Sequence, residues 1–367
     1  MLPAFLPQNE HRTPPTSDSP PNPPVVPRTL TQRELNRALL ARQLLLERGR
    51  MSIPKALERI AGIQAQYAPS MYIGLWTRLE ALEREALTRA LARRTVVQGT
   101  MMRATIHLVS RADYWPFSLG IRAARTAWWE RVHPNADPRQ MRAAAKKLRR
   151  FLSDGPRRRK EVEELLGREL ALGIGAYLDL VRVPPSGTWD QRRADLYGLA
   201  EGWIGPPDST PDDGLEHLVR RYLAGFGPAY KTDIADYAGV GVTQVGQVLE
   251  RLRLRRFRDE AGKELLDLPR APLPDPEAPA PARFLPVWDS TLLVHARRTG
   301  ILPEEYRPRI FNVRTPHSVN TFLLDGQVAG TWRYESGRVR LEPFGRLPRA
   351  ARKELDEEAE RLAAFHS

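Results

Sequence analysis

Hydrophobic positions in the first part of the chain follow helical spacing and then change to strand-like runs. A capping box opens the first predicted helix at Thr31, and a serine–proline pair opens the second at Ser52. A third helix is predicted over residues 83–93, and two β-rich runs follow at residues 95–98 and 104–109. Three helices followed by a hairpin wing are typical of a winged helix, so the pattern predicts one here.

The same order of elements recurs along the chain. Residues 139–170 are helical and very basic, and residues 178–204 contain short β-rich stretches. Residues 214–268 show the pattern best, with two helices joined through Gly239-Val240-Gly241 and then two wing strands. The glycine segment is also compatible with a helix-hairpin-helix motif, although the leucine–proline lead-in of that motif is missing.

Proline-rich segments flank the predicted units. Residues 1–28 hold nine prolines and are predicted to be disordered, and residues 269–282 hold six, which indicates an extended linker or a surface strap. Asp325-Gly326 lies between two apolar runs and predicts a type I′ hairpin, with a charged helix over residues 349–365. The predicted fold is α+β and mainly helical. It has a tail (1–28), three winged-helix units (29–135, 136–212 and 213–268), a strap (269–282) and a C-terminal β-hairpin region with a helix (283–367).

Composition narrows the class of protein. The 367 residues carry a net charge of +13 and a sequence pI of about 10.3, while hydrophobic residues make up 41%. This excludes wholesale disorder and favours an anionic partner. Cysteine is absent, which excludes disulfides, a cysteine nucleophile and thiolate metal sites. We expect a cytoplasmic chain, because no run is long enough to span a membrane and no signal peptide is evident.

Basic residues are clustered within the predicted units. Ten Lys or Arg residues and one acid lie between Arg139 and Lys160, including the compact run Arg157, Arg158, Arg159 and Lys160. A second cluster, with Arg255 and Arg256, lies at wing-like spacing. Such clusters fit DNA phosphates, which are bound without regard to sequence. A solvated face on an arginine-rich protein is the alternative.

Candidate catalytic chemistry rests on one glutamine pair. The sequence lacks HExxH, GxSxG, Walker A and GxGxxG motifs, and its histidines have no metal-ligand spacing, so neither a metal nor a cofactor is expected. Gln64-Ala65-Gln66 is predicted to lie at the end of the second helix, just before Pro69. In an extended segment, residues i and i+2 point to the same side, so both amides could hold one water. Two surface or capping amides are the alternative.

Four segments together resemble a known family. They are residues 63–66 (IQAQ), 103–110 (RATIHLVS), 285–293 (LPVWDSTLL) and 328–333 (VAGTWR). In this order they resemble the winged-helix alkylpurine DNA glycosylases, the AlkZ-like family, over about residues 29–365.

The resemblance implies three tandem winged helices that form a concave DNA-binding cradle. It further implies monofunctional hydrolysis of the N-glycosidic bond of N7-alkylated purines, without cofactor, in double-stranded DNA. Gln64 and Gln66 map onto the catalytic pair of the Gln-x-Gln branch, which includes self-resistance enzymes that unhook interstrand crosslinks. We expect a monomer, since a cradle that encloses a duplex needs no second copy.

Further DNA contacts are expected near this pair and in the C-terminal region. Arg103, Thr105 and His107 lie on or before a strand-like run, and a histidine that braces the wing is the alternative for His107. Arg314 and His317 precede the Asp-Gly hairpin and could enter the minor groove, with a surface turn as the alternative. The tryptophans Trp128, Trp129 and Trp203 are interpreted as packing residues.

Two other functions compete with a glycosylase. A non-catalytic winged-helix transcription regulator would share the fold and the basic surface, but it would have no need for two amides in one loop. An RNA-binding or scaffold protein would bind undamaged RNA tightly. The sequence predicts a DNA glycosylase and leaves open which lesion it releases.

Overall fold

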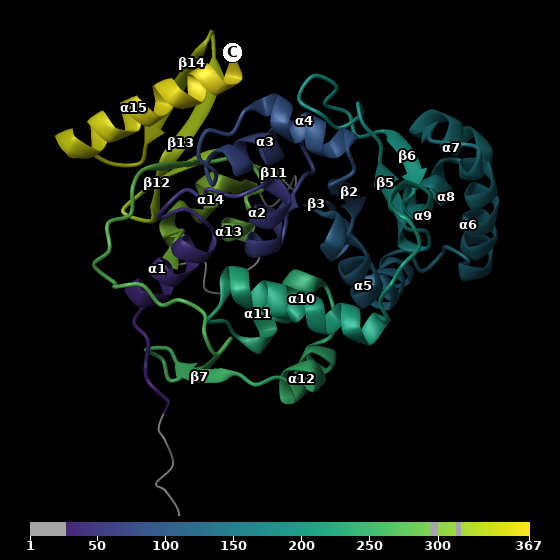
Figure 1. Ribbon diagram of the computed structural model, residues 1–367, viewed down its shortest axis with the longest axis horizontal. Helices are drawn as coiled ribbons and strands as arrows, with labels where there is room; N and C mark the ends of the chain where they lie inside the picture. Colours follow the sequence, from purple (N-terminus) through teal and green to yellow (C-terminus); the bar gives the residue numbers. More distant parts are fainter. Residues whose placement is uncertain (1–26, 294–299, 313–316) are drawn as a thin grey trace, which may run out of the picture.

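The computed structural model describes residues 27–293, 300–312 and 317–367 (Figure 1). The first region contains α1 (Gln32–Arg42), α2 (Ile53–Ile60), β1 (Ile63–Gln64), α3 (Ala68–Trp76), α4 (Arg84–Ala92), β2 (Val96–Thr100), the 3₁₀ turn η1 (Met102–Ala104), β3 (Ile106–Ser110) and α5 (Arg111–Val132). Thr31 caps α1 as predicted. Helix α3 was not predicted, and α2 ends at Ile60, before the glutamine pair. Gln64 therefore lies on a strand and not at a helix end.

The remaining elements follow in two groups. The middle of the chain contains α6 (Pro138–Ser153), β4 (Arg157–Arg158), α7 (Arg159–Leu166), α8 (Arg168–Gly173), η2 (Ile174–Ala176), β5 (Leu180–Arg182), β6 (Leu196–Leu199), α9 (Ala200–Ile204), α10 (Pro211–Phe226), α11 (Lys231–Ala238), α12 (Val242–Arg251), β7 (Arg255–Arg258) and β8 (Glu264–Asp267). The C-terminal part contains β9 (Arg283–Leu285), α13 (Ser290–Leu293), η4 (Glu304–Tyr306), α14 (Arg307–Ile310), β10 (Phe311–Asn312), β11 (His317–Ser318), β12 (Thr321–Leu324), β13 (Gln327–Glu335), β14 (Arg338–Pro343) and α15 (Arg349–His366).

The predicted wings of the first two units are parts of one sheet. Strands β2 and β3 pair as expected, but β2 also pairs with β5, and β3 pairs with β1. The resulting six-stranded sheet has the order β1-β3-β2-β5-β6-β4. Pairing between distant strands is not visible in local patterns, so the sequence suggested two separate hairpins. By contrast, β7 and β8 form a two-stranded sheet after α10, α11 and α12, in the element order expected for the third unit.

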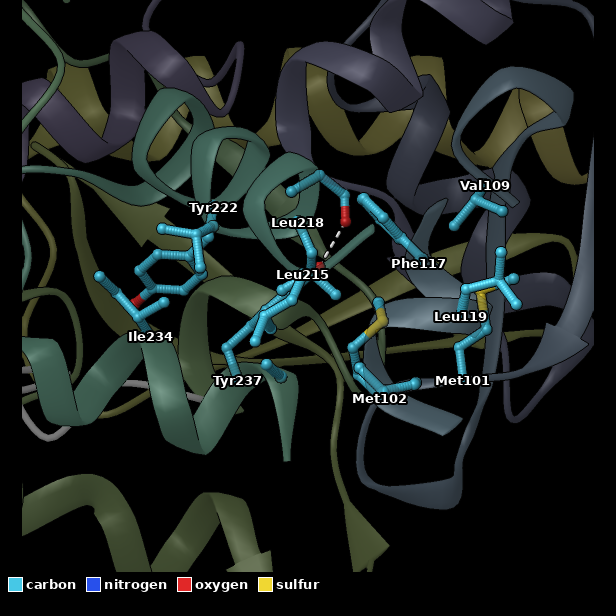
Figure 2. Close-up of a cluster of buried hydrophobic side chains, with 14 of the residues drawn as sticks. Met101, Met102, Val109, Phe117, Leu119, Leu215, Leu218, Tyr222, Ile234 and Tyr237 are labelled. Carbon is cyan, nitrogen blue, oxygen red and sulfur yellow. Dashed lines mark hydrogen bonds between the residues drawn. The ribbon is translucent and has the colours of Figure 1, made fainter. Parts of the chain in front are cut away.

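Helices α5 and α10 pack closely behind this sheet. A Cβ at Gly120 of α5 would lie 2.6 Å from the amide nitrogen of Leu215, and one at Gly214 would lie 2.4 Å from the carbonyl oxygen of Pro116. Only glycine permits this approach of two backbones. Around the crossing, apolar side chains of α5, α10, α11 and η1 form one core, and Figure 2 shows Phe117 and Tyr237 within it.

The C-terminal sheet has the order β14-β13-β12-β9 and is covered by α15. Asp325 and Gly326 both have positive φ, 44° and 79°, as a type I′ hairpin turn requires, so this turn is as predicted. The turn is also a docking point, because Asn36 of α1 donates 2.8 Å to the Gly326 carbonyl and Arg37 donates 3.1 Å to the Asp325 carbonyl. In Figure 1, this region and α6 lie at opposite ends of the long axis.

Buried ion pairs fasten distant segments to the core. Arg42 of α1 makes two hydrogen bonds to Asp267 of β8, at 2.8 and 2.9 Å, and donates to the Pro272 carbonyl of the proline-rich segment. Arg78, just after α3, makes two bonds of 2.9 Å to Asp289. Burial alone would raise the pKa of Asp289, but the Arg78 guanidinium outweighs it and holds that pKa below its usual value.

Candidate active site

The glutamine pair lies where β1 leaves the six-stranded sheet and leads into α3. Gln64 is paired with His107 of β3 and is only 5% exposed, whereas Gln66 is exposed. The two amides were expected on one side of an extended run. The structure brings them to the same corner of the sheet but gives them different exposure.

Both amide oxygens are held by the segment between β2 and β3. Arg103 Nη2 donates to Gln64 Oε1 at 3.3 Å, and the backbone N–H of Ile106 donates to Gln66 Oε1 at 3.2 Å. The Ala65 N–H also donates 2.7 Å to the Ile106 carbonyl. An amide oxygen has two lone pairs, so each glutamine retains one acceptor position for a water.

Arg103 is placed by strained backbone. It has φ 55° and Ala104 has φ 57°, a left-handed conformation that costs roughly 1–2 kcal/mol for a residue with a side chain. The turn is held because Arg103 Nη1 donates 2.6 Å to the Tyr237 carbonyl at the end of α11. Gly239 allows this contact, since a Cβ there would lie 3.2 Å from the Arg103 nitrogen. Burial lowers the pKa of the Arg103 guanidinium below its usual value.

A cleft of about 750 Å³ opens beside Gln66. One wall is formed by Thr100, Ala104 and Ile106 at the ends of β2 and β3, and Trp128 of α5 borders it. Four cationic side chains from the middle of the chain also line the cleft: Arg159, Lys160, Arg182 and Arg193. Two of these, Arg159 and Lys160, are residues predicted to bind DNA, and the structure brings them into one cleft with Gln66.

A second cavity of about 470 Å³ adjoins the first. Ala104 and Trp128 line both cavities, and Arg103, Gly239 and Gln244 line the second. Trp128 is 37% exposed at this junction and its ring lies 6.5 Å from that of Trp129, which is buried as expected. The two cavities are thus neighbours, and the second is lined by Arg103, which anchors Gln64.

His107 does not fit its predicted role in DNA contact. It is fully buried, and burial followed by the nearby Arg103 charge lowers its pKa to about 3. Its Nδ1 lies 3.1 Å from the Thr105 carbonyl, so Nδ1 carries the proton. Thr105 is half-buried and donates 3.1 Å to the Met102 carbonyl. Both side chains brace the strands, which was the alternative for His107.

The other predicted DNA contacts differ in availability. Arg158 is exposed and pairs with Asp195 at 2.8 Å, and Arg157 lies over the Phe151 ring at 4.9 Å. Arg256 is exposed beside Glu264.

Arg255, Arg314 and His317 differ from these exposed arginines. Arg255 donates to buried Asp267 and to the Ala271 carbonyl, at 2.8 and 2.7 Å, so it serves the fold and does not fit the expected DNA contact. Arg314 lies outside the described residues. His317 begins β11, but its side chain is outside the described part of the structure.

Sequence reasoning missed several residues that line the cleft. Arg182 and Arg193 follow from no motif. Tyr67 was missed too; it does not line the cleft, but it is next to Gln66, is 43% exposed and accepts a bond of 3.1 Å from Arg192. A signal for Arg182 was present, because an arginine within the apolar run Leu180-Val181-Arg182-Val183 is rarely buried without a reason.

The described ranges hold neither a metal-binding cluster nor a membrane-spanning helix. Residues 27–293, 300–312 and 317–367 contain no group of three His, Cys, Asp or Glu side chains that could hold a metal ion. Within the same ranges, no helix is long and apolar enough to cross a membrane.

Comparison with known proteins decides the family. The family model for AlkZ-like DNA glycosylases matches residues 57–365. The chain belongs to the AlkZ-like DNA glycosylase family. It is therefore a DNA glycosylase that acts on DNA, and the alternative of a non-catalytic regulator is set aside.

Two comparisons with Streptomyces sahachiroi proteins agree with the family. The glycosylase is 22% identical to an interstrand DNA cross-link repair glycosylase over 358 residues, which cover 88% of this chain and 93% of that protein. The solved structure of the S. sahachiroi DNA glycosylase AlkZ matches with a TM-score of 0.77 and 21% identity, over 92% of this chain and 97% of the other. The mixed α/β fold, about half helical, is thus that of AlkZ.

Proposed function

We propose that this glycosylase hydrolyses the N-glycosidic bond of N7-alkylated purines in double-stranded DNA, with Gln64 and Gln66 placing the attacking water. The observation that supports this is the anchored glutamine pair, of which Gln66 lines a basic cleft. Arg103 and the Ile106 N–H fix one lone pair of each amide oxygen, so the remaining acceptors are preorganised at no further cost.

The chemistry suits neutral amides. Alkylation at N7 makes the purine cationic, which weakens the glycosidic bond and provides a good leaving group. A placed water then suffices, and DNA phosphates stabilise positive charge developing on the sugar. A lysine nucleophile needs desolvation or a neighbouring cation, whereas Lys160 is 88% exposed and lies 3.9 Å from Glu164. These features favour hydrolysis without strand cleavage.

The DNA surface is inferred from the basic elements. The basic helix α6, the run 157–160 and the order α10-α11-α12-β7-β8 support tandem winged helices that form a concave cradle for a duplex. A monomer suffices for such a cradle. Phosphate contacts of this kind predict binding that weakens steeply with salt.

Interstrand crosslinks are a second class of substrate to test. A crosslinked purine is tied to the opposite strand, so it resists extrusion into a tight pocket. The cleft beside Gln66 is large and adjoins a second cavity, which favours access to a lesion that stays near the duplex. The S. sahachiroi relative is named an interstrand DNA cross-link repair glycosylase, which points the same way.

The deciding experiment measures release of 7-methylguanine from methylated duplex DNA. Wild type is compared with Gln64→Ala, Gln66→Ala and, as a matched control, Gln327→Ala, an exposed glutamine at the start of β13. We expect each of the first two variants to lose at least about 100-fold in single-turnover rate with little change in DNA affinity, and the control to keep its rate. A nitrogen-mustard crosslink is assayed in parallel.

Two outcomes would contradict the proposal. Full activity in both glutamine variants would remove the water-placing role. Activity toward neither substrate in the wild type would mean that the lesion is of another kind.

A further inference from the structure

Arg182 is a buried cation at the centre of the six-stranded sheet. It ends β5, opposite Gln98 of β2 and Tyr197 of β6. Its side chain is only 9% exposed, and it lines the same cleft as Gln66. The position thus combines a charge, burial and proximity to the proposed catalytic loop.

Most of the hydrogen-bonding capacity of this guanidinium is unused. Nη2 donates to Thr100 Oγ1 at 3.3 Å, while Nε and Nη1 are buried and have no hydrogen-bond partner. The group lies over the Tyr197 ring at 4.2 Å, which supplies attraction but no acceptor. A buried charged donor without an acceptor is costly, so an unbound Arg182 is in an unfavourable state.

Most of the other buried arginines in the described ranges have a carboxylate. The exception is Arg283, which donates to the Ala282 and Leu46 carbonyls and does not line the cleft. Arg42 pairs with Asp267, Arg78 with Asp289 and Arg125 with Asp179. The two acids that line the cleft are already engaged, because Glu163 accepts from Arg159 and Asp195 accepts from Arg158. Arg182 therefore has a place for an anion that the described chain does not fill.

We propose that Arg182 binds a phosphate of the damaged strand next to the scissile nucleoside. A phosphate is the anionic group of DNA, whereas an N7-alkylated base is cationic and would be repelled. Arg159, Lys160 and Arg193 line the same cleft as Arg182, so neighbouring phosphates of the strand can bind to them. Because one long hydrogen bond holds the guanidinium, it can turn to present Nε and Nη1 as a fork, the geometry that suits phosphate.

This binding would position the substrate for the glutamine pair. Arg182 draws the backbone into the cleft beside Gln66, and its charge is neutralised by the phosphate, so it does not oppose positive charge on the sugar. The proposal rests on the proposed function, since it concerns the same cleft. Its experiment has a binding arm that does not depend on base release.

The experiment pairs a variant with a neutralised phosphate. Each duplex carries one 7-methylguanine and one uncharged methylphosphonate. In one duplex the methylphosphonate replaces the phosphate on the 5′ side of the lesion, and in the other it replaces the phosphate on the 3′ side. Wild type, Arg182→Met, Arg182→Lys and the control Arg220→Met, which removes an equal charge from α10 outside the cleft, are compared at single turnover. Thermal unfolding of every variant shows whether it is folded.

We expect Arg182→Met to slow release about 30-fold on ordinary DNA, and Arg182→Lys to slow it less. At one methylphosphonate position, wild type should slow by a similar factor and Arg182→Met should slow no further, because the same contact is already lost. The control should lose a constant factor at all positions. Additive losses at every position, or a folded Arg182→Met with the rate of the wild type, would overturn the proposal.

The binding arm separates this proposal from the proposed function. Affinity is measured on duplexes with a tetrahydrofuran abasic analogue in place of 7-methylguanine, with the same methylphosphonate series. Non-additive affinity losses for Arg182→Met at one position would support the phosphate contact even if no purine were released. Additive losses at all positions would refute it even if the glutamine variants behaved as proposed.

Discussion

Arginine is buried in two parts of this molecule under different conditions. At the junctions between segments, Arg42 and Arg78 each face a buried aspartate through two hydrogen bonds of 2.8–2.9 Å. At the glutamine loop, Arg103 and Arg182 are also largely removed from solvent, but neither forms an ion pair among the described residues. Burial lowers the pKa of the Arg103 and Arg182 guanidinium groups, which means that their charged forms are disfavoured. At the paired site, Arg78 lowers the pKa of Asp289, which means that the charged carboxylate is favoured.

The difference separates stability from function. A paired guanidinium has its charge neutralised within the fold, so it holds segments together and does not need an anionic ligand. An unpaired one costs stability in the free protein and regains it only when an anion binds. Of the buried arginines without a carboxylate, Arg182 lines the cleft in which we propose that a DNA phosphate binds, whereas Arg283 of β9 donates to two backbone carbonyls.

The largest expected effect is on stability at a paired site. Arg78→Met leaves the Asp289 carboxylate buried without its partner and also removes a 2.9 Å bond to the Gly74 carbonyl. Loss of one partner of a buried pair costs about 3–5 kcal/mol. Urea unfolding should show this decrease in the free energy of unfolding.

The double variant Arg78→Met/Asp289→Leu provides the control, because it removes both charges and should recover most of the loss. A double variant as unstable as Arg78→Met would mean that the packing of the arginine stem, and not the ion pair, stabilises this junction.

The opposite outcome is expected at Arg182. Arg182→Met removes a charge that lacks a counter-ion, so the free energy of unfolding should equal that of the wild type or exceed it by about 1 kcal/mol. Release of alkylated purine should fall at the same time. Parallel urea unfolding and single-turnover assays measure both quantities, and a loss of stability as large as that of Arg78→Met would contradict the distinction between the two regions.

Arg103 is tested through the glycine that supports it. Gly239→Ala introduces a side chain at φ +72° and places its Cβ 3.2 Å from the Arg103 nitrogen, so it should cost about 1–2 kcal/mol and shift the anchor of Gln64. We expect purine release to fall about 10-fold. Gly262→Ala is the matched control, since Gly262 has φ +79° but nothing within 4 Å of an added Cβ. Equal rates in the two variants would show that backbone strain alone matters.

Local features of the fold were predictable and the site was predictable only in part. The cap at Thr31 and the turn at Asp325-Gly326 depend on neighbouring residues, so the sequence contains them. Helix α3 was missed because all of its residues are buried, which removes the polar face that marks a helix. Arg182 was missed because its place in the cleft depends on pairing of β5 with β2 and β6, strands that are distant in sequence.

The smallest expected effect concerns His107 and measures the charge of Arg103 from within the fold. Burial first and the Arg103 charge second lower the pKa of His107 from 6.5 to about 3, so the folded protein binds fewer protons than the unfolded chain between these values. Stability is therefore complete above pH 6.5 and falls as the pH decreases, by at most about 1.4 kcal/mol per unit. His107→Asn does not titrate, and its amide can replace the Nδ1 donor to Thr105. Urea unfolding at pH 8 gives the difference in the free energy of unfolding that is due to packing alone. The same difference is measured at pH 5.5, and its change from pH 8 is the contribution of His107 titration. The variant should gain relative to the wild type on acidification. Arg103→Met keeps the histidine but removes its charged neighbour, so it should raise the folded-state pKa of His107, and its stability should differ from that of the wild type only as the pH approaches that value. The two proteins are therefore also compared at pH 4, where Arg103→Met should have lost less stability than the wild type. Identical losses at pH 4 would show that the charge of Arg103 does not act on His107.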